Sequence, residues 1–181
     1  MRIIAGNWKG VHLFPPAGTA IRPTSDRLRE AIFNIVGNQI REKRVLDLFA
    51  GTGAMGLEAL SRGAAHATFI DHSFEALALV RRNIAKVDAG DRSAVIRWDI
   101  ARNLDCLDGH GVFDWVFVDP PYARGFVGRT LASVAAAGFE CGQIVVEHDA
   151  KDVIDPIPVD LRLADQRRYG KTLVSFLGPM V

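Results

Sequence analysis

Cysteines and long apolar runs are scarce in this sequence. Its 181 residues contain two cysteines, Cys106 and Cys141, which lie far apart and outside any CxxC spacing. This pattern excludes a disulfide framework and gives no support to a zinc site, so we expect reduced cysteines, a cytoplasmic protein and no bound metal. No apolar run approaches the roughly 20 residues that span a bilayer, and the N-terminus has no secretory apolar core. We therefore expect no membrane partner.

A strong net charge of one sign is also lacking. The whole chain carries +1, but its charges are unevenly spread. Residues 1–44 contain eight Lys and Arg against three Asp and Glu, whereas the rest of the chain has an excess of acids. The N-terminal quarter is therefore the candidate surface for phosphate groups, with a solvated helix face as the alternative.

The length and the 49% hydrophobic content suffice for one substantial core and are too little for two ordinary domains. We expect a single domain over residues 1–181, with an extension over 1–23 and a core over 24–181. Two short strand-like pieces, 2–6 and 10–13, predict a small N-terminal β-hairpin. The breaker-rich residues 15–20 that follow predict a loop.

The core alternates short apolar runs with segments of helical periodicity. A helix capped by Thr24 or Ser25 is expected to end at Gly37. The alternation after it predicts a Rossmann-like, doubly wound α/β fold with a mostly parallel seven-stranded sheet. The last two strands, on either side of Tyr169-Gly170-Lys171, predict an antiparallel hairpin at one edge. The expected helices cover 54–62, 74–87 and 125–137, and the expected strands cover 45–49, 67–70, 94–98, 113–118, 143–146, 161–168 and 172–177.

A glycine loop joins the first strand of this core to a helix. Gly51-x-Gly53-x-x-Gly56 matches the dinucleotide fingerprint, and Asp71 ends the next strand, where an acid can bind ribose hydroxyls. The pattern indicates a nucleoside site and makes a nicotinamide dehydrogenase one candidate. The glycines could instead only permit tight packing of the helix on the strand.

Asp47 argues for a different nucleoside. A carboxylate just before the loop would repel the phosphates of a dinucleotide but attract an ammonium group. S-adenosylmethionine carries an ammonium group and no phosphate, and its methionine end could pass close over Gly51 and Gly53. Asp99, after the third strand, is then placed for the adenine, although Asp47 could instead bind a backbone amide and Asp99 begin a turn. The candidate cofactor residues in this region are Asp47, Phe49, Ala50, Gly51, Thr52, Gly53, Asp71, His72, Asp99 and Ile100.

Asp119-Pro120-Pro121-Tyr122 follows the fourth strand, at the carboxyl edge of the sheet and therefore near the cofactor. Two successive prolines hold the backbone extended, so the Asp119 carboxylate and the Pro120 carbonyl have fixed directions. Two such acceptors suit the two hydrogens of an amino group on a nucleobase, and Tyr122 can stack on the base. The motif predicts methyl transfer to an exocyclic amine, with an ordinary X-Pro-Pro turn as the alternative.

Together these motifs resemble the methyltransferases that modify exocyclic amines of adenine or guanine. More narrowly, the chain resembles the bacterial 16S rRNA guanine-N2 methyltransferase family, and the resemblance covers nearly all of it. The segments that carry it are residues 2–10, 22–34, 47–53, 56–63 and 119–122. The first two segments favour guanine, since the Asp-Pro-Pro-Tyr motif alone also fits an adenine-N6 methyltransferase.

The resemblance implies a monomeric enzyme that uses S-adenosylmethionine to methylate the N2 amine of a guanine in 16S rRNA or in a small ribosomal subunit assembly. It places catalysis at Asp119, Pro120, Pro121 and Tyr122, and it has Arg22 and Thr24 close over the cofactor. Trp8 could stack on a base or only cover the core. A non-catalytic RNA-binding scaffold is a further alternative. The expected RNA contacts are Arg2, Trp8, Lys9, Arg22, Arg27 and Arg29.

Overall fold

The computed structural model describes residues 1–16, 25–121, 125–137, 139–152, 154 and 156–180. Arg22, Thr24 and Tyr122 lie outside the described residues, as does most of the expected loop over 15–20. The α-helices are α1 (Asp26–Val36), α2 (Ala54–Ser61), α3 (Phe74–Lys86) and α4 (Phe126–Ala136), with short 3-10 turns η1 (Gly37–Ile40), η2 (Gly90–Arg92) and η3 (Asp105–Leu107). The strands are β1 (Arg44–Leu48), β2 (His66–Asp71), β3 (Ser93–Arg97), β4 (Val112–Val118), β5 (Glu140–Asp149), β6 (Leu161–Tyr169) and β7 (Thr172–Pro179).

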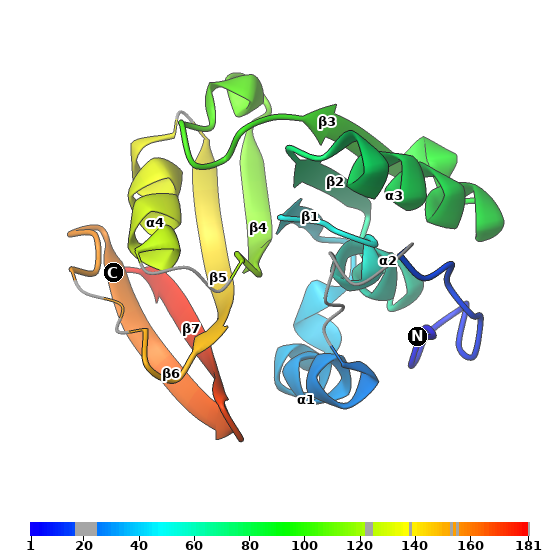
Figure 1. Cartoon of the computed structure of the whole chain (residues 1–181), viewed down its shortest axis with the longest axis horizontal. Coiled ribbons are helices and arrows are strands. Elements are labelled where there is room, and N and C mark those ends of the chain that lie inside the picture. Colours follow the sequence, from blue (N-terminus) through cyan, green and yellow to red (C-terminus); the bar gives the residue numbers. More distant parts are fainter. Residues whose placement is uncertain (17–24, 122–124, 138, 153, 155, 181) are drawn as a thin grey trace.

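The seven strands form one sheet in the order β3-β2-β1-β4-β5-β7-β6 (Figure 1). Strands β1 to β5 pair in parallel, and β7 pairs antiparallel with both β5 and β6. The predicted fold class and the antiparallel C-terminal hairpin are confirmed. The chain moves outward from β1 to β3 and then returns to place β4 beside β1. The order of the strands therefore reverses between β1 and β4, which is where ligands bind in open α/β sheets.

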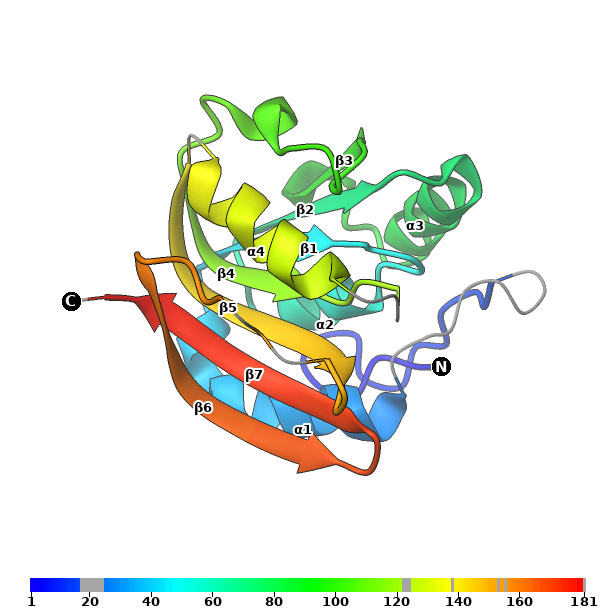
Figure 2. The same ribbon diagram turned by 60° about the vertical axis from the view of Figure 1, so that its left-hand side comes forward.

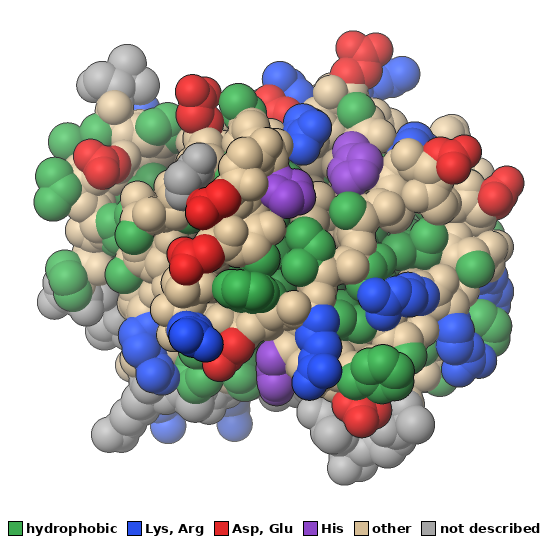
Figure 3. All heavy atoms as spheres, turned by 90° about the horizontal axis from the view of Figure 1, so that it is seen from above, with side chains coloured by type: hydrophobic (Ala, Val, Ile, Leu, Met, Phe, Trp, Pro, Cys, Tyr) green, Lys and Arg blue, Asp and Glu red, His purple; other side chains and the backbone are tan. Residues whose placement is uncertain are grey.

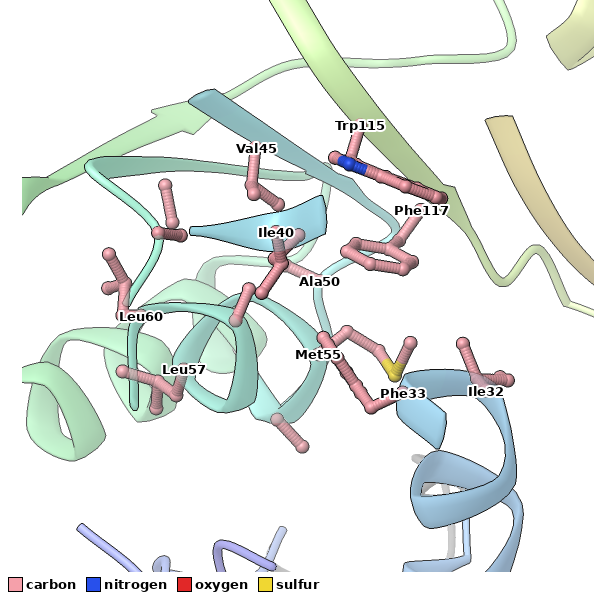
Figure 4. Close-up of a cluster of buried hydrophobic side chains, with 14 of the residues drawn as sticks. Ile32, Phe33, Ile40, Val45, Ala50, Met55, Leu57, Leu60, Trp115 and Phe117 are labelled. Carbon is pink, nitrogen blue, oxygen red and sulfur yellow. The ribbon is translucent and has the colours of Figure 1, made fainter. Parts of the chain in front are cut away.

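Side chains that alternate along the strands build a separate core on each face of the sheet. Val45, Trp115 and Phe117 face α1, α2 and α3, whereas the adjoining Leu46 and Val116 face η3 and α4. Figure 2 shows α4 in front of the sheet and α1 and α2 behind it. Figure 4 shows the first core, where side chains of α1 and α2 meet those of β1 and β4. Both faces are thus covered, as the near-continuous apolar composition of parallel strands requires.

Local signals explain where the helices begin and end. The Ser25 hydroxyl accepts a hydrogen bond from the Leu28 amide at 3.1 Å and caps α1, and Ser73 caps α3 through the Ala76 amide at 3.2 Å. Gly37 follows α1 with a φ of 57°, a conformation that glycine adopts without strain. The sequence therefore predicted both ends of α1 correctly, with Ser25 as the cap.

The predicted N-terminal hairpin has less strand pairing than expected. It contains a single antiparallel bridge, between Arg2 and His12. The amides of Ile4 and Ala5 donate instead to the carboxylate of Glu58 in α2, at 2.8 and 3.1 Å. The N-terminal segment is thus bonded to α2 as well as to itself, and Figure 1 shows it beside α2.

Candidate functional site

The loop after β1 is the centre of the candidate site. Asp47 is buried under it and accepts a hydrogen bond from the Gly56 amide at 2.9 Å. Asp47 therefore does bind a backbone amide, which was the alternative to a cofactor role. Burial raises the pKa of Asp47 to about 7; the Gly56 hydrogen bond lowers this pKa and the nearby Asp71 charge raises it. An ammonium group above the loop would favour the charged form of Asp47, so the carboxylate remains suited to the expected methionine end.

The glycines of the loop have different physical roles. A Cβ on Gly56 would lie 2.3 Å from the Phe69 ring, so Gly56 allows α2 to pack on β2. Gly51 and Gly53 have φ values of 56° and 76° and shape the turn itself. Phe49 also has a positive φ, of 61°, which costs a bulky residue of order 1–3 kcal/mol. Such strain is typical of functional loops.

Asp71 holds the loop from the next strand. Its carboxylate accepts hydrogen bonds from the Gly51 amide at 3.0 Å and from the Ser73 amide at 2.9 Å, one on each oxygen. A carboxylate has about four lone-pair positions, so both oxygens can still accept ribose hydroxyls. His72 is exposed, and its Nδ1 lies 3.4 Å from Asp71.

An open cleft of about 770 Å³ lies beside this loop. It brings together Phe49, His72, Asp99 and Ile100 of the expected cofactor set with Pro121 of the expected catalytic set. Asp47, Gly51 and Asp71 are not among the described residues that line it, and the side chains of Asp47 and Asp71 are buried. The other lining residues are Arg97, Trp98, Ala101, Arg102 and Phe126.

The chemistry of the cleft fits the adenosine part of S-adenosylmethionine. Phe49 and Phe126 stand edge to face with ring centroids 6.4 Å apart, and Ile100 adds a buried apolar side chain. The Asp99 carboxylate accepts a hydrogen bond from the Ala101 amide at 3.1 Å, so it begins a turn while it also lines the cleft. These residues provide apolar surface for a base and a carboxylate for its amino group. The expected cofactor roles of the individual residues stay predictions.

Asp119, Pro120 and Pro121 follow β4 directly, next to the point where the strand order reverses. Asp119 is half-buried, Pro120 is buried, and Pro121 is exposed on the wall of the cleft. The structure thus brings the described part of the motif to the edge of the cofactor cleft. The catalytic role of the motif stays a prediction.

The expected RNA contacts divide into exposed and buried residues. Arg2, Lys9 and Arg27 are exposed. Arg29 corrects the expectation, because its side chain is fully buried and bonded within the protein, to Asp26 at 3.0 Å and to the Arg2 carbonyl. A guanidinium so placed cannot reach RNA in this structure.

Trp8 is partly buried and packs against the first core, in agreement with the alternative that it covers the core. The Arg92 guanidinium lies 5.2 Å from the centroid of the Trp8 ring. Arg92 thus lies over the Trp8 ring, and an RNA contact by Trp8 stays a prediction. Figure 3 shows basic, acidic and hydrophobic side chains interspersed on one face of the molecule.

Sequence reasoning missed Asn83, which connects the N-terminal segment to the glycine loop. Its side-chain amide donates to the Thr52 carbonyl at 2.9 Å, and its oxygen accepts from the Phe14 amide at 2.7 Å. Arg82 and Lys86 lie over the Phe14 ring at 4.4 and 4.3 Å. The available signal was a polar residue three positions after Val80, within the apolar stripe of α3.

Other site types find no support in the described part of the chain. No group of three or more His, Cys, Asp or Glu side chains there could hold a metal ion. None of the described helices is long and apolar enough to cross a membrane. Cys106 and Cys141 are free thiols, and burial raises their pKa values to about 11 and about 12.

Comparison with known proteins agrees with the geometry. The family model described as Conserved hypothetical protein 95 matches residues 1–178. Ribosomal RNA small subunit methyltransferase D of Escherichia coli K12 is 34% identical over 173 residues, which cover 94% of this chain and 86% of that protein. The Bacillus subtilis protein YlbH, named provisionally as an rRNA methyltransferase, is 37% identical over 97% of both chains.

Solved structures give the same result. The Escherichia coli protein yhhF, described provisionally as a methyltransferase, superposes with a TM-score of 0.85 and 34% identity over 99% of this chain and 97% of that one. A hypothetical protein of Thermus thermophilus superposes with a TM-score of 0.79 and 31% identity over 97% of this chain and 98% of that one. Both similarities extend over the whole domain, including the N-terminal segment. The chain therefore belongs to the Conserved hypothetical protein 95 family and is a methyltransferase.

Proposed function

We propose that the protein transfers a methyl group from S-adenosylmethionine to the N2 amine of a guanine in 16S rRNA. The observation that carries the proposal is the position of Asp119-Pro120-Pro121. The motif follows β4 at the edge of a cleft that suits an adenosine, beside a glycine loop and two buried carboxylates. Relatives that share the whole domain are named as rRNA small-subunit methyltransferases, which favours this reaction over hydride transfer.

When bound, S-adenosylmethionine would supply the methyl group, with its sulfur–methyl bond breaking as the new C–N bond forms. The methylated amine then loses one proton to solvent water. Asp119 and the Pro120 carbonyl accept the two hydrogens of the amine and so aim its lone pair at the methyl carbon. Asp71 binds the ribose, and Asp47 faces the methionine ammonium. Catalysis is then mainly orientation, which can contribute about 7–11 kcal/mol to lowering a barrier. Tyr122 is proposed to stack on the extruded base.

The RNA is proposed to lie across the N-terminal segment and α1, where Arg2, Lys9 and Arg27 are exposed. We add Arg82 and Lys86 to this surface, because they flank Phe14 beside the glycine loop. The net charge of +1 is small for an RNA enzyme, so recognition would depend on the shape of the folded RNA more than on phosphate neutralisation. We propose a monomer that acts in the cytoplasm without a metal.

The experiment is nucleoside mass spectrometry on RNA from cells that lack this enzyme. The protein and S-adenosylmethionine are incubated with purified small subunits and, separately, with bare 16S rRNA. N2-methylguanosine is the expected product, and the more active of the two substrates identifies the physiological one. N6-methyladenosine would instead support the adenine-N6 alternative, and absence of any methylated nucleoside would contradict the proposal.

A further inference from the structure

Glu147 is a carboxylate without a role in the mechanism above. It lies near the end of β5 and is only 8% exposed. β5 is the parallel neighbour of β4, and the last pair in their register joins Val118 with Val146. Asp119 is the first residue after β4, and Glu147 is the next residue of β5. Continuation of this register one residue past the end of β4 places their backbones about one strand spacing, 4.8 Å, apart at the carboxyl edge of the sheet.

The two acids also share a face of the sheet. Successive side chains of a strand point to opposite faces, so Glu147 points to the same side as Val145, and continuation of the β4 alternation past Val118 places Asp119 on the side of Phe117. Phe117 and Val145 belong to the core under α1 and α2. Val174, the antiparallel partner of Glu147 on β7, belongs to that core as well. Glu147 thus adds a second carboxylate on the side of the sheet that Asp119 occupies.

The hydrogen-bonding edge of guanine has more donors than Asp119 and Pro120 can satisfy. Its N1–H and its N2 amine present three N–H groups, whereas adenine presents one amine and a lone pair at N1. Asp119 and the Pro120 carbonyl account for the two amine hydrogens. We propose that Glu147 accepts the N1–H and thereby selects guanine over adenine. This inference rests on the proposed function and deepens it by naming the residue that reads the base.

The selection has a direct physical cause. A carboxylate strengthens a hydrogen bond with N1–H, and in a nearly buried position little water competes for it. With adenine in the site, the same carboxylate would face the N1 lone pair. The carboxylate and the lone pair would repel each other, and both would lose their bound water without gaining a hydrogen bond. A site built to bond an N–H rejects a base without it far more strongly than an apolar pocket rejects a change of size.

A base analogue tests this inference directly. 2-Aminopurine keeps the 2-amine, has a lone pair at N1 and lacks the O6 carbonyl, and it is placed in 16S rRNA at the position where mass spectrometry finds the methyl group. We expect the wild-type protein to prefer guanine over 2-aminopurine by about 10- to 100-fold in kcat/KM. The Gln side chain of Glu147→Gln can accept from N1–H or donate to an N1 lone pair, so its preference should be at least about threefold smaller than that of the wild type, and any part that remains is assigned to O6.

The matched control is Glu140→Gln, the same change at the exposed start of β5, which should keep the wild-type preference. S-adenosylhomocysteine affinity, measured by calorimetry, should be unchanged in both variants. A Glu147→Gln protein that keeps the full preference would overturn the inference. If that variant does not fold, the wild type still decides, because equal rates on guanine and 2-aminopurine would mean that N1–H is not read. Absence of N2-methylguanosine from unmodified RNA would instead overturn the proposed function itself.

Discussion

The guanidinium of Arg29 lies 3.5 Å from the carboxylate of Glu58, and neither side chain has any exposed surface. Glu58 also accepts from the amides of Ile4 and Ala5 and from the Arg62 guanidinium at 2.8 Å. One buried carboxylate therefore connects α1, α2 and the N-terminal segment. This arrangement holds the N-terminal segment and α1, which carry the proposed RNA surface, against α2.

Removal of the Glu58 charge should destabilise the protein strongly. Glu58→Gln leaves the buried Arg29 charge paired only with the partly exposed Asp26, and removal of one partner from a buried ion pair costs about 3–5 kcal/mol. The free energy of unfolding, measured in urea, should fall by that amount. Glu30→Gln, at an exposed position of α1, is the control and should change it by less than about 0.5 kcal/mol. A loss below about 1 kcal/mol for Glu58→Gln would show that the pair does not hold these segments together.

Asp119 should be needed for turnover but not for binding of the cofactor. Asp119→Ala removes an acceptor for the amine, so kcat should fall by at least about 100-fold, in the range of a lost positioning or electrostatic contact. Binding of S-adenosylhomocysteine, measured by calorimetry, should stay within about threefold. Asp91→Ala, at an exposed position in η2, is the matched control and should retain activity. Equal losses of turnover and binding would contradict this division of roles.

The stability of the ligand-free protein should depend on pH through Asp47. Its pKa is raised from 3.8 to about 7 in the folded state, so between these values the folded protein holds a proton that the unfolded chain has lost. Stability therefore falls as the pH rises from about 4 to about 7 and then levels off. Asp47→Asn keeps an acceptor for the Gly56 amide and should remove this contribution. Urea unfolding at several pH values measures the difference, and parallel pH profiles for both proteins would refute it.

The same protonation should couple to cofactor binding. The charged form of Asp47 attracts the methionine ammonium and the protonated form does not. The affinity for S-adenosylhomocysteine should therefore tighten between about pH 6 and pH 8 in the wild type. In Asp47→Asn this gain should be smaller, when both proteins are titrated by calorimetry in the same buffers. An identical gain in the two proteins would place the ammonium group away from Asp47.

Gly56 and Gly128 should respond oppositely to alanine. A Cβ at Gly56 meets the Phe69 ring at 2.3 Å, so Gly56→Ala should destabilise the protein by about 1–3 kcal/mol through overpacking. Gly128 lies within α4, and a Cβ there would have no neighbour within 4 Å among the described residues, so Gly128→Ala should stabilise by about 0.4–1 kcal/mol. Thermal unfolding of the two variants tests this contrast. Equal shifts would mean that α2 is not packed tightly on β2.

Most of the fold could be predicted from local signals. Apolar runs, serine caps and the glycine after α1 identified each helix and strand of the core, because these signals act within a few residues. The largest difference is β5, which covers Glu140–Asp149 instead of 143–146. Its first residues pair with β4, and its last ones continue beside β7, so its length depends on neighbouring strands rather than on its own composition.

The candidate site was predictable in outline for the same reason. Residues near the ends of neighbouring parallel strands lie at the same edge of the sheet: Asp47 and Asp71 lie near the ends of β1 and β2, and Asp119 follows β4. The sequence alone thus determined the fold class, and it predicted the place of the candidate site and an acceptor pair for an amine.

Tertiary structure alone decided which of these side chains are exposed and what they contact. Arg27 and Arg29 stand two residues apart on α1, yet one is exposed and the other is buried against Glu58. Asn83 joins Phe14 to Thr52, and the pairing of β4 with β5 brings Val146 beside Val118, across distances that no local pattern encodes. Burial and ion pairing depend on which distant segments fold side by side, whereas periodicity and capping depend only on neighbours along the chain.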